Sequence, residues 1–170
     1  LFLFSKRAAS VALFLWRRYL CLNNNMQIGN KEPFFLIAGP CQIESEQHAF
    51  TMARAIKNVA DYCGIEFFYK SSFDKANRTS LTGKRGAGLE RGMEIFDKLK
   101  AEMPDLKIIT DIHTEQQAEI VAPHVDALQI PAFLCRQTDL LLAAGETGKY
   151  INIKKGQFLE IGRASCRERV

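Results

Sequence analysis

The chain has 170 residues, of which 47% are hydrophobic and 25% are charged, so it is long enough for one globular core and too apolar for a disordered segment. Its net charge of +4 belongs to the flanks, since residues 1–25 carry +4 and residues 160–170 carry +1, which leaves −1 for residues 26–159. This balance excludes a basic field that attracts nucleic acid, and we expect no nucleic-acid partner.

The number and spacing of the cysteines indicate the redox compartment. There are five, an odd number at irregular spacings, and no two form a C-x-x-C pair. This usage indicates neither a disulfide framework nor a zinc knuckle. We therefore expect a reducing, cytoplasmic environment.

Both ends of the chain differ in composition from the segment between them. Residues 1–25 are apolar but interrupted by basic pairs, so no run approaches the ~20 apolar residues that cross a bilayer, and we expect no membrane contact. We interpret residues 1–25 as a non-native or disordered extension, with an organellar transit peptide as the alternative. Residues 160–170 lack an apolar period and resemble a translated sequencing adaptor, so we interpret them as an artefactual tail.

Apolar runs that alternate with helical periods organise the rest of the chain. The predicted strands are residues 34–38, 65–70, 106–110, 125–130 and 150–153. The first run is continuous, which predicts a strand buried on both faces. The predicted helices are residues 46–63, 89–103 and 115–122 and a stretch around 140–144. Ser45 caps the first helix, and Thr114 with Gln117 forms a capping box for the third.

Strands that alternate with helices predict a parallel sheet with right-handed crossovers, hence the α/β class. A nucleotide-binding doubly wound sheet is disfavoured because no G-x-G-x-x-G and no Walker loop is present. We therefore predict an incomplete (β/α)8 TIM barrel with about five of the eight β/α units.

Each predicted strand ends in polar side chains. They are Cys41, Lys70, Asp111 with His113, Gln129, and Lys154. In a parallel α/β protein the strand ends form one rim, where functional residues lie. The loop after Lys70 adds Lys75, Asn77 and Arg78, which offer phosphate point charges, a neutral donor and a guanidinium fork. The alternative is a solvated loop whose charges serve solubility.

These side chains lie in motifs that follow one another along residues 33–159: Ala-Gly-Pro-Cys at 38–41 with Glu-Ser at 44–45, Lys-Ser-Ser-Phe-Asp-Lys-Ala-Asn-Arg at 70–78, Ile-Thr-Asp at 109–111, Gln-Ile-Pro-Ala-Phe at 129–133, Arg-Gln-Thr-Asp at 136–139 and Asn-Ile-Lys-Lys at 152–155. Together they resemble the 3-deoxy-D-manno-octulosonate 8-phosphate (KDO-8-phosphate) synthases. The resemblance implies that residues 26–159 are the N-terminal part of a TIM-barrel synthase domain.

The implied reaction is a transferase step of lipopolysaccharide biosynthesis. Phosphoenolpyruvate condenses with D-arabinose 5-phosphate and water, which gives 3-deoxy-D-manno-octulosonate 8-phosphate and phosphate. We expect the 170-residue chain by itself to be inactive.

The resemblance also implies roles for single residues. The expected catalytic residues are Lys70, Lys75, Asp111 and Lys154, and the expected substrate-binding residues are Ser72, Asn77, Arg78, Thr79, Gln129, Phe133 and Arg136. Residues 77–79 would receive the sugar phosphate, and Asp111 would bind a sugar hydroxyl. Arg136 resembles a position that meets the sugar phosphate of a neighbouring subunit, which implies a homo-oligomer, a tetramer by resemblance.

Cys41 is the expected metal ligand. From the sequence alone, a lone buried cysteine is more often a packing residue than a ligand. Within the family, cysteine at this position implies the metal-dependent type, in which a divalent cation orients substrate or water. The other ligands, a histidine, a glutamate and an aspartate, are expected beyond residue 159, and His113 does not replace them. We therefore expect this chain to bind metal weakly or not at all.

Two other functions remain open. A related barrel synthase that uses erythrose 4-phosphate or an amino sugar would share the Gly-Pro-Cys start. The erythrose 4-phosphate enzymes typically carry Pro-Arg-Thr where this chain has Ala-Asn-Arg-Thr at 76–79. A non-catalytic phosphate-binding module would keep the polar rim without the chemistry.

Overall fold

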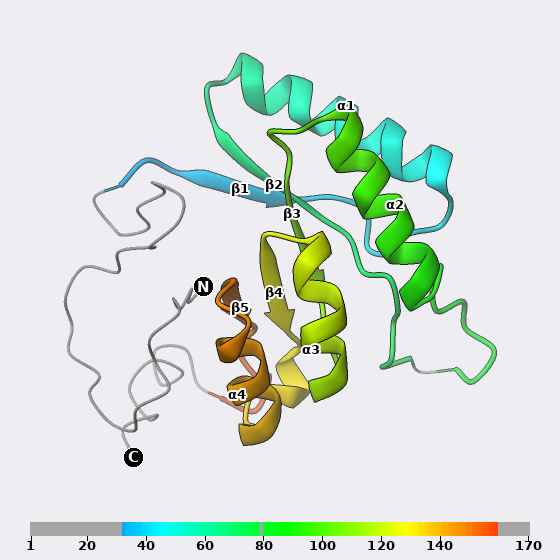
Figure 1. Cartoon of the computed structure of the whole chain (residues 1–170), viewed down its shortest axis with the longest axis vertical. Coiled ribbons are helices and arrows are strands. Elements are labelled where there is room, and N and C mark those ends of the chain that lie inside the picture. The colour runs from blue at the N-terminus through cyan, green and yellow to red at the C-terminus, as the bar shows by residue number, and fades with distance from the viewer. Residues whose placement is uncertain (1–31, 79, 160–170) are drawn as a thin grey trace. The chain divides into compact units, whose positions relative to one another are not determined.

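The computed structural model describes residues 32–78 and 80–159 (Figure 1). The strands are β1 (Phe35–Ala38), β2 (Glu66–Lys70), β3 (Lys107–Asp111), β4 (Ala127–Ile130) and β5 (Tyr150–Ile153). The helices are α1 (Glu46–Tyr62), α2 (Leu89–Glu102), α3 (Glu115–Val121) and α4 (Thr138–Glu146), with short 3-10 turns η1 (Ala122–His124) and η2 (Ala132–Leu134). The predicted extension 1–25 and tail 160–170 lie outside the described residues.

The order of the strands decides between the two predicted architectures. The sheet runs β1-β2-β3-β4-β5, so its neighbours are also successive strands of the chain. β1 and β2 are parallel, as are β2 and β3. A doubly wound sheet would reverse direction at a switch point, whereas a (β/α)8 barrel keeps the chain order. Within the described residues, the prediction of an incomplete TIM barrel with about five β/α units is confirmed.

The described residues form two compact units. The first unit, residues 33–111 and 123–127, holds β1, β2 and β3 with α1 and α2. Its buried residues include Ala49, Ala53, Tyr69, Phe73, Phe96, Leu99 and Ile108. The second unit, residues 112–122 and 128–159, holds α3, α4, β5 and most of β4. Its buried residues include Ala118, Val121, Leu128, Ile130, Leu140, Ala144 and Ile151.

Helix starts follow the predicted caps. The Ser45 side chain accepts a hydrogen bond of 3.1 Å from the backbone N–H of His48, and α1 begins at the next residue after Ser45. Thr114 accepts from the N–H of Gln117 at 3.4 Å, and the Gln117 side chain accepts in return from the N–H of His113. The return bond reaches one residue before the cap, a variation on the capping box.

α1 and α2 lie side by side and are joined by exposed ion pairs (Figure 1). We name these pairs the α1–α2 ion row; they are Arg54–Glu102 and Glu46 with Arg91 and Lys98. Water screens such pairs, so each stabilises the fold little. None of the helices in the described segments is long and apolar enough to cross a membrane.

β1 differs from the prediction of a strand buried on both faces. All four of its residues are only half-buried, and Phe34, just before it, is 70% exposed. Within the described residues β1 stands at one end of the strand order, where it pairs with β2 alone. The prediction was wrong because a continuous apolar run does not reveal whether a strand is central or at an edge.

Candidate anion site at the ends of β2 and β3

The carboxyl ends of β2 and β3 bring polar side chains to one place. The register places Lys70 opposite Ile109. Side chains two residues apart on a strand share a face, so Ser72 and Asp111 follow on the same face as this pair. β3 extends through Asp111, one residue further than predicted, which adds this carboxylate to the regular strand.

We name Lys70, Ser72, Lys75 and Asp111 the Ser72 cluster, because the Ser72 hydroxyl connects all four. It accepts hydrogen bonds of 2.8 Å from the Nζ atoms of Lys70 and Lys75 and donates one of 2.6 Å to Oδ2 of Asp111. An ammonium can only donate and a carboxylate can only accept, so this arrangement uses the donor and both lone pairs of the hydroxyl. Ser72 is fully buried, so its rotamer is held by packing as well.

The cluster carries more positive than negative charge. Nζ of Lys70 lies 3.4 Å from the Asp111 carboxylate, and Nζ of Lys75 lies 3.9 Å from it. Both lysine side chains are 18% exposed, and that of Asp111 is 9% exposed. Two ammonium groups thus share one carboxylate in a largely buried place. Because burying an unpaired charge is costly, the surplus positive charge favours an anionic ligand.

Burial shapes the protonation of the cluster. It lowers the pKa of Lys70 by more than the negative charge of Asp111 raises it, and the charge of Lys75 lowers it further. Burial also raises the pKa of Asp111, but the charges of Lys70 and Lys75 and the hydrogen bond from Ser72 outweigh this and hold it below its ordinary value. Asp111 is therefore ionised at neutral pH, while Lys70 releases its proton more readily than an ordinary lysine.

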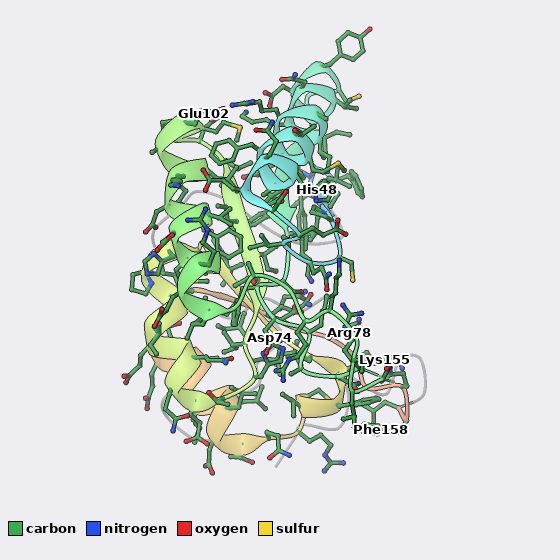
Figure 2. All side chains as sticks on the ribbon, turned by 90° about the vertical axis from the view of Figure 1, so that its right-hand side faces the viewer. His48, Asp74, Arg78, Glu102, Lys155 and Phe158 are labelled. Atoms are coloured by element: carbon green, nitrogen blue, oxygen red, sulfur yellow. The ribbon has the colours of Figure 1, made fainter. Side chains whose placement is uncertain are left out.

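The loop after β2 carries further expected ligands. Asn77 and Arg78 are exposed there, and Thr79 lies outside the described residues. Arg78, visible on this loop in Figure 2, donates from Nη2 to the amide oxygen of Gln42. Sequence reasoning missed Gln42. Its place directly after Cys41, at the end of the first strand, is the signal that could have found it.

In the second unit the expected residues fall into two groups. Asn152 donates a hydrogen bond of 2.9 Å from its amide to the amide oxygen of Gln129, so these two side chains meet. Asn152 belongs to the Asn-Ile-Lys-Lys motif at 152–155, but it was not among the expected site residues. Lys154, Phe133 and Arg136 are exposed, with Phe133 in η2 and Arg136 shortly before α4.

Cys41, the expected metal ligand, is exposed, and it follows the half-buried strand β1. Its thiolate would lie near enough to the Lys70 ammonium to interact electrostatically. Among the described residues, no three histidine, cysteine, aspartate or glutamate side chains gather as a metal-binding group. The described residues therefore do not fit a complete divalent-metal site, and Cys41 offers a single ligand.

Comparison with known proteins adds the family context. A family model described as the DAHP synthetase I family matches residues 17–167. Proteins named 2-dehydro-3-deoxyphosphooctonate aldolase are 64% identical over 135 residues in Bartonella henselae, 61% over 135 residues in Brucella anthropi and 58% over 142 residues in a Chelativorans species. These alignments cover 79%, 79% and 81% of this chain and 48%, 48% and 51% of the relatives. The chain spans about half the length of the curated relatives it matches, and the resemblance inferred from the motifs is confirmed.

Proposed function

The chain belongs to the DAHP synthetase I family, and from this premise we propose that it carries part of the site of a KDO-8-phosphate synthase. The reaction would condense phosphoenolpyruvate with D-arabinose 5-phosphate and water, as a transferase of lipopolysaccharide precursor synthesis in the cytoplasm. The shared name of the relatives supports this proposal. The observation in this chain that carries it is the Ser72 cluster, with two ammonium groups for one carboxylate.

Phosphoenolpyruvate has a phosphate and a carboxylate, so its site needs concentrated positive charge. Lys70 gives one hydrogen to Ser72 and one, at 3.5 Å, to Asp111, and Lys75 gives one to Ser72. An ammonium has three hydrogens. The remaining hydrogens can meet ligand oxygens with charge-assisted hydrogen bonds. The low exposure of both lysines reduces screening, which makes these bonds stronger than they would be on an open surface.

The proposed chemistry forms one carbon–carbon bond and one carbon–oxygen bond, and it breaks the carbon–oxygen bond to phosphate. The carbon nucleophile of phosphoenolpyruvate attacks the sugar aldehyde, water adds at the second carbon of phosphoenolpyruvate, and phosphate leaves. Lys70 and Lys75 would hold the phosphate as it departs. Asp111 would accept a hydrogen bond from a sugar hydroxyl, while Asn77 and Arg78 would bind the sugar phosphate and fix the aldehyde for attack.

Residues of the second unit have proposed roles of their own. Because Asn152 donates to the amide oxygen of Gln129, the Gln129 NH2 group faces away from Asn152 and is oriented as a donor. Lys154 would add positive charge for phosphoenolpyruvate, and Phe133 would contribute apolar contact. Arg136 would reach the sugar phosphate of a neighbouring subunit in a homo-oligomer, a tetramer by the family resemblance.

A divalent metal is proposed for the whole enzyme because Cys41 stands at the family's ligand position. This chain alone should bind metal weakly or not at all, since one thiolate is a poor divalent-cation site. Metal content after purification in excess divalent cation measures this. One metal ion per chain in the 170-residue protein would contradict the expectation.

The proposed function is tested in a chimera of residues 26–159 followed by the carboxyl-terminal half of the Bartonella henselae relative. We expect phosphate release that requires both phosphoenolpyruvate and arabinose 5-phosphate, with kcat/KM at least about tenfold lower for erythrose 4-phosphate. The full-length relative is the matched control. Equal turnover of the two sugars would contradict the assignment of arabinose 5-phosphate as the substrate. Binding of phosphoenolpyruvate without phosphate release would favour the non-catalytic module.

A further inference from the structure

The loop between β2 and α2 is closed at its base by an ion pair that the proposed chemistry does not use. Nε of Arg85 donates to Oδ1 of Asp74 at 2.8 Å, and Nη2 donates to Oδ2 at 2.5 Å. Directly beside this pair, the backbone N–H of Lys75 donates to the carbonyl oxygen of Arg85 at 2.7 Å. We propose that Asp74 and Arg85 are positioning residues that hold Lys75 in the Ser72 cluster.

The chain is also fixed where it enters this loop. Phe73 is 1% exposed, and its carbonyl oxygen accepts a hydrogen bond of 3.0 Å from the N–H of Gly88. Gly92 packs closely against the side chain of Phe73, since a Cβ at Gly92 would stand 2.5 Å from Cβ of Phe73. Gly86 has φ 114°, and a Cβ there would stand 2.6 Å from the Phe73 carbonyl oxygen. Close packing therefore determines the direction in which the chain reaches Asp74.

Lys75 is consequently held at both of its ends. Its backbone is bound to Arg85, and its Nζ lies 2.8 Å from the Ser72 hydroxyl. A free lysine side chain loses rotamer freedom when it is ordered. Here that ordering takes place during folding, so it does not reduce the affinity for an anion.

A guanidinium can also bind an anion directly, but the geometry of Arg85 favours the positioning role. Both its Nε and its Nη2 are engaged by Asp74, in the bidentate form that fixes a guanidinium most firmly. The two roles predict opposite effects for Asp74→Asn. If Arg85 is a direct ligand, removal of a negative charge strengthens anion binding. If the pair positions Lys75, binding weakens although the site has become more positive.

The experiment measures the affinity of the chimera for inorganic phosphate and for phosphoenolpyruvate by calorimetry, together with kcat and the KM for phosphoenolpyruvate. We expect Asp74→Asn and Arg85→Ala to weaken binding of both anions roughly tenfold and to raise KM more than they lower kcat. Arg85→Lys keeps the charge and a single hydrogen bond, so it should recover part of the loss.

Arg54→Ala is the matched control. Arg54 binds Glu102 with the same bidentate geometry, at 2.6 and 2.7 Å, and Glu102 is the last residue of α2, at the end away from the loop (Figure 2). It should leave anion affinity unchanged. Unchanged or tighter phosphate binding in Asp74→Asn would overturn the proposal, as would equal losses in Arg85→Ala and Arg54→Ala.

This inference rests on the proposed function only in taking Lys75 as an anion ligand. Phosphate binding is measured without turnover, so the proposed function and the positioning role can be refuted independently. A chimera that binds phosphate in this pattern but forms no product would refute the synthase and uphold the positioning role. A chimera that forms product, but whose Asp74→Asn variant has the same KM for phosphoenolpyruvate as the parent, would uphold the synthase and refute the positioning role. If Asp74→Asn does not fold, the anion affinity of Arg85→Lys must still lie between that of Arg85→Ala and that of the parent.

Discussion

The Ser72 cluster and the α1–α2 ion row use the same kinds of residue to different ends. In the row, Arg54 and Glu102 have side chains that are 51% and 40% exposed. In the cluster, Lys70 and Asp111 are 18% and 9% exposed, and a second ammonium accompanies them. The row joins two helices through solvated ion pairs. The cluster concentrates surplus positive charge where little water reaches it.

This difference shows in the pKa values. In the row, the hydrogen bond from Arg54 is the main cause that lowers the pKa of Glu102, as in an ordinary surface pair. In the cluster, burial is the largest influence on both Lys70 and Asp111, and the pKa of Lys70 is lowered although a carboxylate lies beside it. Exposure, more than residue type, distinguishes a candidate ligand site from a structural ion pair.

The largest expected effect is on stability, from Asp111→Asn in the chimera. The change leaves two largely buried ammonium groups without their carboxylate, so we expect a loss of about 4 kcal/mol in the free energy of unfolding. Urea denaturation at neutral pH measures it. Glu102→Gln in the row is the matched control and should shift the midpoint far less. Equal shifts for the two variants would erase the distinction between cluster and row.

Asp111 also predicts an acid dependence. Its folded pKa lies below the ordinary value of 3.8, so its stabilisation is complete above that value and is lost as the pH falls through the folded pKa. Asp111→Asn should therefore lose less stability than the parent between about pH 6 and about pH 2. Parallel stability curves for parent and variant would contradict this.

Gly39→Ala tests how closely the backbone approaches the cluster. A Cβ at Gly39 would lie 2.1 Å from the carbonyl oxygen of Lys70, so the added methyl group must displace the backbone that carries this lysine. We expect destabilisation of about 3 kcal/mol together with weaker phosphate binding. Gly145→Ala is the control, because a Cβ there meets no atom within 4 Å. A Gly39→Ala variant as stable as the parent would show that the approach is looser.

Lys70→Met should chiefly affect binding. Loss of this ammonium should weaken phosphate binding about 50-fold, while Lys98→Met in the row should leave it unchanged. In the parent, affinity requires protonated Lys70, so it should decline as the pH rises through a value below the ordinary 10.5. Calorimetry across this range checks both points. An alkaline decline that persists unchanged in Lys70→Met would assign it to another group.

Arg54→Ala is expected to have the smallest effect of all on stability. Water already screens its pair with Glu102, so the difference from the parent should be small and should shrink further as salt is added. Thermal unfolding at low and high salt measures this. A large, salt-independent loss would mean that the row stabilises the fold as strongly as the cluster does.

Much of the local structure followed from sequence patterns. Ser45 and Thr114 begin helices as predicted, because a hydroxyl that caps a helix acts on backbone groups within three residues. The alternation of strands and helices predicted the barrel order. The meeting of Lys70 with Asp111 followed in turn, because parallel neighbours end on the same edge of a sheet.

Other features depended on contacts between distant residues. No local pattern reveals that Cys41 is exposed or that β1 is half-buried, because both depend on which strands stand beside them. The contact of Arg78 with Gln42 spans 36 residues, and the pair of Asp74 with Arg85 exists only because the loop closes at its base.

The sequence by itself therefore determined the α/β class, the order of the elements, the helix caps and the polar residues at the strand ends. These depend on hydrophobic period and on hydrogen bonds between near neighbours. Only the tertiary structure decided that Ser72 joins two lysines to one aspartate and that burial lowers the pKa of Lys70. Desolvation and charge balance arise from everything packed around a group, so no stretch of sequence contains them.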